Sequence, residues 1–454
     1  MKKIILTLIF AVLSFNYVSA QQWTVVPSPS PSTVRNILRG VGSITSNDVW
    51  AVGVYDQLPS LTLTQHWDGS SWQTVSSPSP GSGYNELYEV QGFASNDVYS
   101  VGYYASTQGI PQMLVLHWNG SSWNIMSTPT VQGGSGFECI FGLSPNNIYA
   151  GGYKAVGAPG PTTGTLIGHW NGSSWSIIPS PNQSNNRTNR IEDMKGLSDN
   201  DIWAAGYSRA IGENFKAMLI HKDGSGWNLV TIPLIGDESF LYSVDPISAN
   251  DVWATGDYND AGTLHPLFMH FNGSSWTLVT SPDGGASTTH FSANDIWSVG
   301  GGFAHYDGNV WSDVAVQSPD GTSLLNVTRT PSNSLWVVGR YFDGNILKTL
   351  TMRYDNLTGI LGNGTTPGKF SLEQNYPNPF NPSTVIKYDI ANAGNVSLKI
   401  FNVIGQQVAV LQDGFKNAGS YEVNFNAFNL PSGVYFYTIK TNDFTDTKKM
   451  LLVK

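Results

Sequence analysis

Residues 46–80 read SNDVWAVGVYDQLPSLTLTQHWDGSSWQTVSSPSP, and the pattern of this stretch recurs along most of the chain. Seven copies align on one turn position, which is usually an Asp: Asp48, Asp97, Asn147, Asp201, Asp251, Asp295 and Ser334. Two residues later every copy has an aromatic residue: Trp50, Tyr99, Tyr149, Trp203, Trp253, Trp297 and Trp336. Five residues after the turn position every copy has a glycine: Gly53, Gly102, Gly152, Gly206, Gly256, Gly300 and Gly339. Two fixed spacings, kept at a period of about 50 residues, indicate a repeat architecture.

The second half of the repeat is equally regular. In six copies a His precedes a Trp by six residues: His66 and Trp72, His117 and Trp123, His169 and Trp175, His221 and Trp227, His270 and Trp276, His305 and Trp311. An Asp-Gly or Asn-Gly pair between them is the turn chemistry of a tight hairpin. Alternating and β-branched runs flank these turns, so each copy predicts four antiparallel strands, A to D. Four-stranded repeats of this length are typical of the blades of a β-propeller.

The two ends of the repeat region complement each other. The seventh copy has Arg353 in place of the His and lacks the Trp six residues later. Trp23 has the context of the missing Trp, because Pro29 follows it by six residues as Pro78 follows Trp72. We therefore expect the segment around Trp23 to add strand D to the last blade, which closes the ring and removes an exposed sheet edge. Residues 21–360 are expected to form a seven-bladed β-propeller in an all-β chain.

The repeat resembles the kelch-like and Asp-box β-propellers in its four-stranded unit, its glycine and its tryptophan. This resemblance implies the propeller fold and no catalytic residue. The sialidase-type Asp box reads Ser-x-Asp-x-Gly-x-Thr-Trp, whereas DGSSW at 68–72 has one residue fewer between the acid and the Trp.

The composition changes after the Gly/Thr-rich linker 361–369, and residues 370–454 alternate short strand patterns with turn signals. This predicts a small Ig-like β-sandwich. The segment closely resembles the type A C-terminal sorting domain of the type IX secretion system of Bacteroidetes and related bacteria. Its matching stretches are NYPNPFNPST (375–384), LKIFNVIGQQV (398–408), LPSGVYFY (430–437) and KKMLLVK (448–454). The motif residues singled out are Asn375, Pro377, Pro379, Gly405, Gly433 and Lys448.

The resemblance implies a route out of the cell. Its expected partners are the type IX translocon and the sorting-domain peptidase, with the cut falling before residue 370. The cargo would then be released or joined to surface lipopolysaccharide. The N-terminus agrees, because Lys2 and Lys3 precede an apolar run at 4–15 and a small-residue cleavage site that ends at Ala20. We expect residues 1–20 to be a signal peptide and the mature protein to be secreted or on the outer surface, reached through the periplasm.

Composition excludes several partner classes. The formal net charge is −9 and only 12% of residues are charged, so no basic patch favours nucleic acid. After the signal peptide no apolar run approaches the ~20 residues that a membrane-spanning helix needs, so no transmembrane segment is expected in the mature chain. The single Cys139 cannot form an internal disulfide.

The aligned histidines and turn acids favour structure over chemistry. A propeller spaces one His per blade around the ring, whereas a metal ion needs ligands that converge within ~2–2.6 Å. We expect each His to satisfy a neighbouring turn, and Asn and Asp to bond their own backbone. No metal, cofactor or catalytic residue is predicted.

Variable loops are the expected place of function. The A–B and C–D turns are short and share one face, whereas the B–C and D–A connections vary and share the opposite face. The B–C inserts include 154–165, 208–216 and 257–266, and the D–A link 182–195 holds the densest charge. A ligand site is expected on this face near blades three to five, and the binding candidates are Tyr84, Glu86, Arg187, Arg190, Glu192, Asp193, Arg209, Glu213 and His265.

These observations predict an exported β-propeller that acts as a binding or interaction module for a glycan or a protein. The alternative is an extracellular polysaccharide hydrolase or lyase with its site on the variable-loop face. A glycosidase would need two carboxylates ~5–9.5 Å apart at the channel mouth. A purely structural surface component is a third possibility, and it predicts no saturable ligand.

Overall fold

The computed structural model describes residues 23–57, 59–106, 108–156, 162–183, 188–355, 369–392, 394–416, 419–427, 430–441 and 444–453. The signal peptide with Ala20, the candidate Arg187 and most of the linker 361–369 lie outside these residues. The chain divides into two units, Met1–Asp355 and Asn356–Lys454, which are described separately. Within the described residues, no helix is long and apolar enough to cross a membrane.

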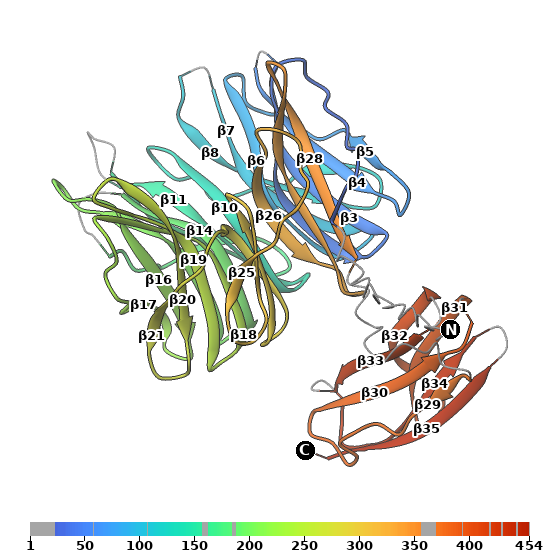
Figure 1. Ribbon diagram of the computed structural model, residues 1–454. Helices are drawn as coiled ribbons and strands as arrows, with labels where there is room; N and C mark the ends of the chain where they lie inside the picture. The colour runs from blue at the N-terminus through green and yellow to red at the C-terminus, as the bar shows by residue number, and fades with distance from the viewer. Residues whose placement is uncertain are drawn as a thin grey trace, which may run out of the picture. The chain divides into compact units, whose positions relative to one another are not determined.

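The described part of the first unit forms seven four-stranded antiparallel sheets, the blades of a β-propeller (Figure 1). Blades 1 and 2 contain β2 (Asn36–Thr45), β3 (Asp48–Tyr55), β4 (Leu61–Trp67), β5 (Trp72–Val75), β6 (Tyr84–Ala94), β7 (Asp97–Ala105), β8 (Pro111–Trp118) and β9 (Trp123–Ile125). Blades 3 and 4 contain β10 (Ser135–Ser144), β11 (Asn147–Ala155), β12 (Thr163–Trp170), β13 (Trp175–Ile178), β14 (Thr188–Ser198), β15 (Asp201–Arg209), β16 (Lys216–Asp223) and β17 (Gly226–Val230).

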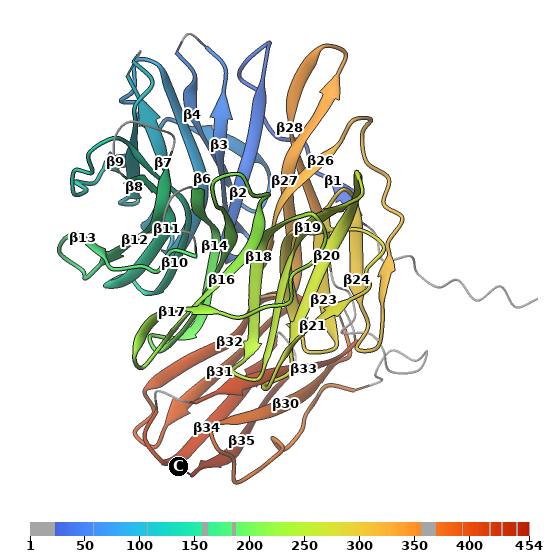
Figure 2. The same cartoon turned by 90° about the vertical axis from the view of Figure 1, so that its left-hand side faces the viewer.

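Blades 5 and 6 contain β18 (Glu238–Ser248), β19 (Asp251–Asp260), β20 (Thr263–Phe271), β21 (Trp276–Val279), β22 (Gly285–Ser292), β23 (Asp295–Gly300), β24 (Phe303–Tyr306) and β25 (Trp311–Asp313). Blade 7 contains β26 (Ser323–Arg329), β27 (Ser334–Asp343), β28 (Ile346–Asp355) and β1 (Trp23–Val25). The N-terminal strand therefore completes the last blade, as expected (Figure 2). Trp23 pairs with Tyr354 in this sheet and has its indole against Trp297 of blade 6.

The C–D hairpins are fixed by the Asp-Gly and Asn-Gly turns that the sequence repeats. In blade 1, Asp68 Oδ1 accepts hydrogen bonds from the backbone N–H groups of Ser70 and Ser71 at 2.8 and 2.9 Å. Gly69 has a φ of +95°, a conformation that a residue with a Cβ seldom adopts. The same carboxylate or amide contact recurs at Asn119, Asn171, Asn272 and Asp307.

A β-bulge recurs at one position of strand A in every blade, nine residues before the turn position. The bulged residues are Arg39, Tyr88, Glu138, Glu192, Tyr242, Ala286 and Leu325. The repeated glycine of strand B lies opposite this bulge, where the two backbones approach closely. In blade 4, a Cβ added at Gly206 would collide with the carbonyl oxygen of Arg190. The glycine that recurs in every copy is therefore required by the close backbone approach at the bulge.

Gly206→Ala should consequently destabilise the propeller although it adds only one methyl group. The added carbon meets backbone, which cannot rotate away, so we expect a loss of about 1–3 kcal/mol in the free energy of unfolding. Urea unfolding followed by circular dichroism measures it. Gly224→Ala, in the exposed β16–β17 turn, is the control, because Gly224 has no atom within 4 Å of the added Cβ and, like Gly206, no positive φ. A loss at position 206 no larger than at position 224 would contradict this interpretation of the glycine.

The bulge also makes neighbouring blades hydrogen-bond to each other. The residue after it accepts a hydrogen bond from a backbone N–H of the next blade: Glu89 from Ile140, Asp193 from Val244, Ser243 from Thr288, Ser287 from Val327 and Asn326 from Val41. The last of these contacts joins blade 7 to blade 1. Side chains thus link the blades in addition to apolar packing, and buried backbone donors are satisfied across the ring.

The tryptophans pack between blades. The Trp of strand D lies edge-on against the strand B aromatic of the preceding blade in six pairs: Trp72 on Trp336, Trp123 on Trp50, Trp227 on Tyr149, Trp276 on Trp203, Trp311 on Trp253 and Trp23 on Trp297. The ring centroids of these pairs are 5.1–6.0 Å apart. Such T-shaped contacts are favourable for aromatic quadrupoles.

Each aligned His is held by its own blade. In blade 1, His66 stacks on Trp50 with centroids 4.5 Å apart, and its Nε2 lies 2.8 Å from Asp48 Oδ1. The other five blades with a His repeat both contacts, with Asn147 replacing the Asp in blade 3. In blade 7 the guanidinium of Arg353 takes this place over Trp336 at 5.7 Å. These contacts agree with the expected role of the histidines, because Nε2 of each ring lies within hydrogen-bond distance of the turn residue of its own blade.

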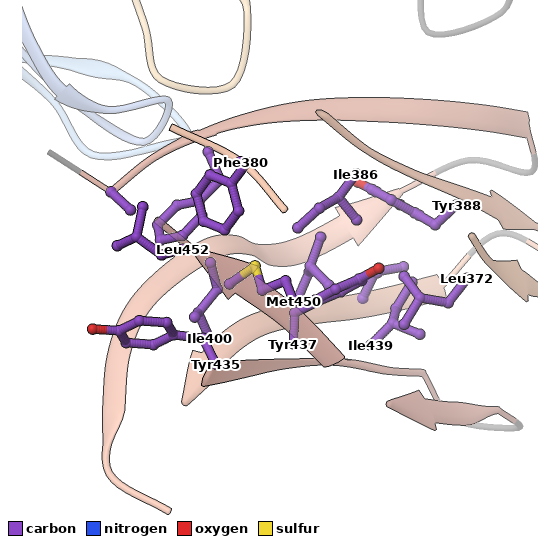
Figure 3. Close-up of a cluster of buried hydrophobic side chains, with 14 of the residues drawn as sticks. Leu372, Phe380, Ile386, Tyr388, Ile400, Tyr435, Tyr437, Ile439, Met450 and Leu452 are labelled. Carbon is purple, nitrogen blue, oxygen red and sulfur yellow. The ribbon is translucent and has the colours of Figure 1, made fainter. Parts of the chain in front are cut away.

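The second unit is a β-sandwich of two sheets. One has the order β29 (Ser371–Leu372), β30 (Ser383–Ile390), β33 (Gly419–Asn426). The other has the order β32 (Gln407–Lys416), β31 (Gly394–Asn402), β34 (Gly433–Lys440), β35 (Thr445–Leu452). Alternate residues of the strands point inward, and Figure 3 shows Phe380, Ile386, Tyr437, Met450 and Leu452 gathered between the sheets.

Candidate binding site at the mouth of the central channel

Strands A line a central channel. A cavity of about 470 Å³ is bordered by strand A residues of all seven blades, among them Val41, Gln91, Lys195, Thr289 and Thr328. The first residues of each strand A pair with the end of strand B, as Tyr84 does with Ala105. The N-terminal ends of strands A therefore lie on the face of the B–C and D–A connections. On that face strands A and B carry a continuous set of aromatic and charged side chains.

The set begins at the junction of blades 1 and 2. Arg39 Nε donates to Glu86 Oε1 at 2.6 Å, and its guanidinium lies 4.7 Å from the ring centroid of Tyr88. The Tyr88 and Tyr103 hydroxyls are 2.6 Å apart, and the Tyr84 ring meets Tyr103 edge-on at 5.6 Å. Burial raises the pKa of Tyr103, so its hydroxyl remains a hydrogen-bond donor at neutral pH. Three tyrosines are therefore held around one half-buried ion pair.

The set continues through blades 3 and 4. Tyr103 meets Tyr153 edge-on at 6.1 Å, and the Arg190 guanidinium lies 4.9 Å from the Tyr153 ring centroid. Arg190 is paired with Glu138 through two hydrogen bonds and with Glu192 at 2.9 Å. The Glu138 side chain is 1% exposed and that of Arg190 is 28% exposed. One arginine thus compensates a fully buried carboxylate and still reaches the channel.

The set ends in blade 5. Tyr207 meets Phe240 edge-on at 5.0 Å, and Phe240 stacks on Tyr242 at 6.1 Å. Burial raises the pKa of Tyr207 to about 12, which keeps its hydroxyl protonated beside Glu192. Burial also raises the pKa of Asp257, against a hydrogen bond from Tyr242. We call the whole set the aromatic arc: Arg39, Tyr84, Glu86, Tyr88, Tyr103, Glu138, Tyr153, Arg190, Glu192, Tyr207, Phe240, Tyr242 and Asp257.

The sequence-based candidates separate into three groups. Tyr84, Glu86, Arg190 and Glu192 lie in the aromatic arc. Arg209 lies next to it, because its guanidinium is 4.3 Å from the Phe215 ring and Phe215 contacts Tyr207. Glu213 is exposed in the turn between β15 and β16, and His265 stacks on Tyr258 in the β19–β20 hairpin.

Asp193 has a different position. Its Oδ1 accepts the N–H of Met194 at 2.7 Å, and its Oδ2 accepts from Ser243 Oγ and the N–H of Val244, both at 2.9 Å. The carboxylate is therefore occupied in joining blades 4 and 5. Arg187 lies outside the described residues.

Several members of the arc were not among the sequence-based candidates, although the repeat contains a signal for them. Tyr103, Tyr153 and Tyr207 each directly follow the invariant glycine, in three consecutive copies. Arg39, Tyr88 and Glu138 share the bulge position. When the copies are aligned, the position after the glycine is tyrosine in three consecutive blades. Such a run at one aligned position indicates side chains that gather on one face.

The arc offers stacking surfaces and hydrogen bonds rather than metal chemistry. Tyrosine rings supply large rigid contact areas at low entropic cost, and paired guanidinium and carboxylate groups bind hydroxyls in fixed directions. Over the described residues, no group of three or more His, Cys, Asp or Glu side chains could hold a metal ion.

The sorting-motif residues build the edge of the C-terminal sandwich. Asn375 is buried; its N–H donates to the Tyr437 hydroxyl at 2.7 Å and its Nδ2 donates to Thr384 Oγ1 at 3.0 Å. The Pro377 and Pro379 peptide bonds are cis. Gly405 has a φ of +79° in the β31–β32 turn, Gly433 begins β34, and Lys448 pairs with Asp446 at 3.2 Å.

Comparisons with known proteins address the two units differently. Residues 374–454 match the family described as the secretion system C-terminal sorting domain. Among curated proteins none matches the chain.

Three solved structures are similar at low identity. PorZ, a surface component of the type IX secretion system of Porphyromonas gingivalis, is 13% identical, with a TM-score of 0.47 over 95% of this chain and 61% of PorZ. This chain therefore spans about three fifths of PorZ's length. YCF48 bound to a D1 peptide is 14% identical, with a TM-score of 0.47 over 73% of this chain and 96% of that one. A Hadza microbial sialidase is 13% identical, with a TM-score of 0.42 over 67% and 75%. Because the TM-scores are below 0.5, nothing about this chain is inferred from these similarities. The propeller fold is assigned from the seven four-stranded sheets.

The C-terminal match settles the destination of the chain. The matched segment begins at the buried Asn375 motif and includes all strands of the sandwich from β30 to β35. The C-terminal unit is a secretion system sorting domain carried behind a seven-bladed β-propeller, and it marks the chain for export by type IX secretion to the cell surface or the extracellular space.

Proposed function

We propose that this exported propeller is a glycan-binding module whose ligand lies on the aromatic arc. The observation that carries the proposal is the run of half-buried aromatic side chains, Tyr84 to Tyr242, along strands A and B of blades 2 to 5. Tyrosine faces accept the C–H face of a sugar ring, and the flanking Arg39 and Arg190 ion pairs are fixed partners for its hydroxyls. The sorting domain delivers this surface to the place where extracellular glycans are found.

A polysaccharide hydrolase or lyase is the second candidate, and one observation favours it. Burial raises the pKa of both Glu192 and Asp257, as a general acid requires. Against this, Glu192 is ion-paired with Arg190, and Glu138, the other carboxylate on the same guanidinium, is 1% exposed. Carboxylates that are ion-paired with an arginine are better suited to holding a ligand than to transferring protons. We therefore favour a binding module over a hydrolase or lyase.

Removal of one tyrosine face should weaken the binding of a glycan by about tenfold, which corresponds to roughly 1.4 kcal/mol. The full-length mature chain is first screened on a glycan array, and the affinity of a bound glycan is then measured for Tyr153→Ala and Tyr153→Phe. The Phe variant keeps the ring and should stay within about threefold of the parent, because stacking needs the ring and not the hydroxyl.

Phe342→Ala is the matched control, since Phe342 is 54% exposed on the B–C hairpin of blade 7, outside the arc. Equal affinity for all variants would place the ligand elsewhere. Hydrolysis or elimination products released from the bound glycan would favour the enzyme over the binding module. A chain that binds no glycan on the array but does bind a protein would support the protein-ligand alternative.

A further inference from the structure

The channel has a second, separate group of polar side chains at its other end. The cavity of about 470 Å³ lies along the C-terminal halves of strands A, beside the A–B turns and away from the aromatic arc. Its charged and titratable lining residues are Glu89, Asp193, Lys195, Asp245, His290 and Arg329. They come from blades 2, 4, 5, 6 and 7. Neither the sorting domain nor the arc gives these groups a role.

The acidic groups of this cavity are occupied within the fold. Asp193 accepts three hydrogen bonds, as described above. Asp245 Oδ2 lies 2.8 Å from His290 Nδ1, and its Oδ1 lies 3.8 Å from Lys195 Nζ. Glu89 accepts the N–H of Ile140 at 2.7 Å, and burial, followed by the charge of Asp193, raises its pKa well above the usual range.

The basic groups have donors left over. Lys195 Nζ donates to the carbonyl of Thr288 at 2.7 Å and faces Asp245, which leaves one of its three N–H groups. Arg329 is exposed, borders the cavity and donates through Nη1 to the carbonyl of Phe291 at 3.2 Å, which uses one of its five N–H groups. Lys195 and Arg329 are therefore two cations of the lining with N–H groups beyond those that donate to Thr288 and Phe291.

His290 adds an acceptor of fixed direction. Asp245 at Nδ1 selects the tautomer with its proton on that nitrogen, so Nε2 of the neutral ring is a bare acceptor. The ring is 24% exposed and borders the cavity. A ligand that satisfies this lining has an anionic group for Lys195 and Arg329 and a hydroxyl group for His290.

We propose that this cavity binds a hydroxylated carboxylate of the uronic acid type. The carboxylate pairs with the guanidinium of Arg329 and the ammonium of Lys195, a hydroxyl donates to His290 Nε2, and Thr289 and Thr328 face the remaining hydroxyls. Arginine suits this role because its planar fork matches a carboxylate. The volume is within the range of small-ligand sites and accommodates a sugar ring. The residues proposed to contact this ligand, Lys195, Thr289, His290, Thr328 and Arg329, are not members of the aromatic arc, so the site does not depend on the proposed glycan function.

Isothermal titration of the full-length mature chain with sodium glucuronate at neutral pH and low salt tests the proposal. We expect saturable binding, no binding of methyl glucoside, and at least a tenfold loss of affinity in Arg329→Met. Arg35→Met is the matched control, because Arg35 pairs with Asp56 on the opposite face, and it should keep the parent affinity. Circular dichroism of each variant verifies that the sheets are intact.

Lys195→Met supplies a second measurement, because its ammonium lies in the cavity and Arg329 lies at its rim. If Lys195→Met does not fold, Thr289→Val, which removes one lining hydroxyl, takes its place and should weaken binding. If a glucuronate oligomer binds more tightly than the monosaccharide, the bound uronic acid is the end of a polysaccharide. If the monosaccharide binds more tightly, the ligand is the free acid. The absence of saturable glucuronate binding, equal binding of methyl glucoside, or an undiminished affinity of Arg329→Met would each overturn the proposal. Loss of arc binding in Tyr153→Ala with glucuronate binding retained would show that the two sites are separate.

Discussion

Trp123→Ala should lower the free energy of unfolding by about 3–5 kcal/mol. Trp123 is 4% exposed and packs edge-on against Trp50 of the preceding blade with ring centroids 5.1 Å apart. It belongs to a cluster with Val52, Leu116 and other buried residues of blades 1 and 2. Truncation removes the burial of an indole and leaves a cavity that the rigid sheets on either side cannot fill. Urea unfolding of the full-length chain, followed by circular dichroism, measures the loss.

Ile125→Ala is the control within the same strand. Ile125 is two residues further along β9 and is 51% exposed, so its truncation should change stability by no more than about 0.5 kcal/mol. The contrast tests the register of strand D as well as the size of the effect. An unchanged stability of Trp123→Ala would mean that the inter-blade packing of the tryptophans is wrong.

Arg190→Ala should destabilise the propeller by about 3–5 kcal/mol, although Arg190 is itself partly exposed. The reason is Glu138, which is 1% exposed and receives two hydrogen bonds from that guanidinium. Without it a carboxylate is left buried and uncompensated. In the variant the folded-state pKa of Glu138 should rise above its unfolded value of about 4.3, so the stability deficit should be small below that pH and grow as the pH rises. Unfolding at pH 5 and pH 8 measures both effects.

Two controls separate the charge from the loss of side-chain packing. The double variant Glu138→Gln with Arg190→Met removes the fully buried carboxylate together with its arginine and should recover part of the lost stability, because only Glu192, whose side chain is 22% exposed, is then left without Arg190. Arg35→Ala removes an exposed arginine paired with Asp56 and should cost no more than about 1 kcal/mol. A deficit in Arg190→Ala that does not depend on pH and is not relieved in the double variant would show that the ion pair is not its cause.

The sequence predicts the ring because every feature of a blade is local. The Asp-Gly and Asn-Gly turns are made by a side chain and the backbone two or three residues later, as at Asp68. The invariant glycine and the aromatic residue repeat at fixed distances from the turn. Trp23 could be assigned to the last blade because it has the sequence context of the Trp that this blade lacks. Such regularities survive in the sequence since each blade must satisfy them again.

The composition of the candidate site could be predicted only in part. Arg190 and Glu192 were among the candidates because the D–A link 182–195 holds the densest charge of the propeller. Asp193 was placed with them, yet its carboxylate bonds to blade 5. The cause is the bulge at Glu192, which interrupts the alternation of strand A, so adjacent residues cannot be assigned to faces by simple alternation.

The sequence by itself determined the blade, the number of copies, the closure of the ring and the sorting domain, because these depend on short-range turn chemistry and recurring motifs. Only the tertiary structure decided which side chains meet in the channel. Glu138 and Arg190 are 52 residues apart, and Tyr103 and Tyr153 come from different blades. These pairs form because neighbouring blades pack side by side, which is a property of the assembled ring that no single repeat contains.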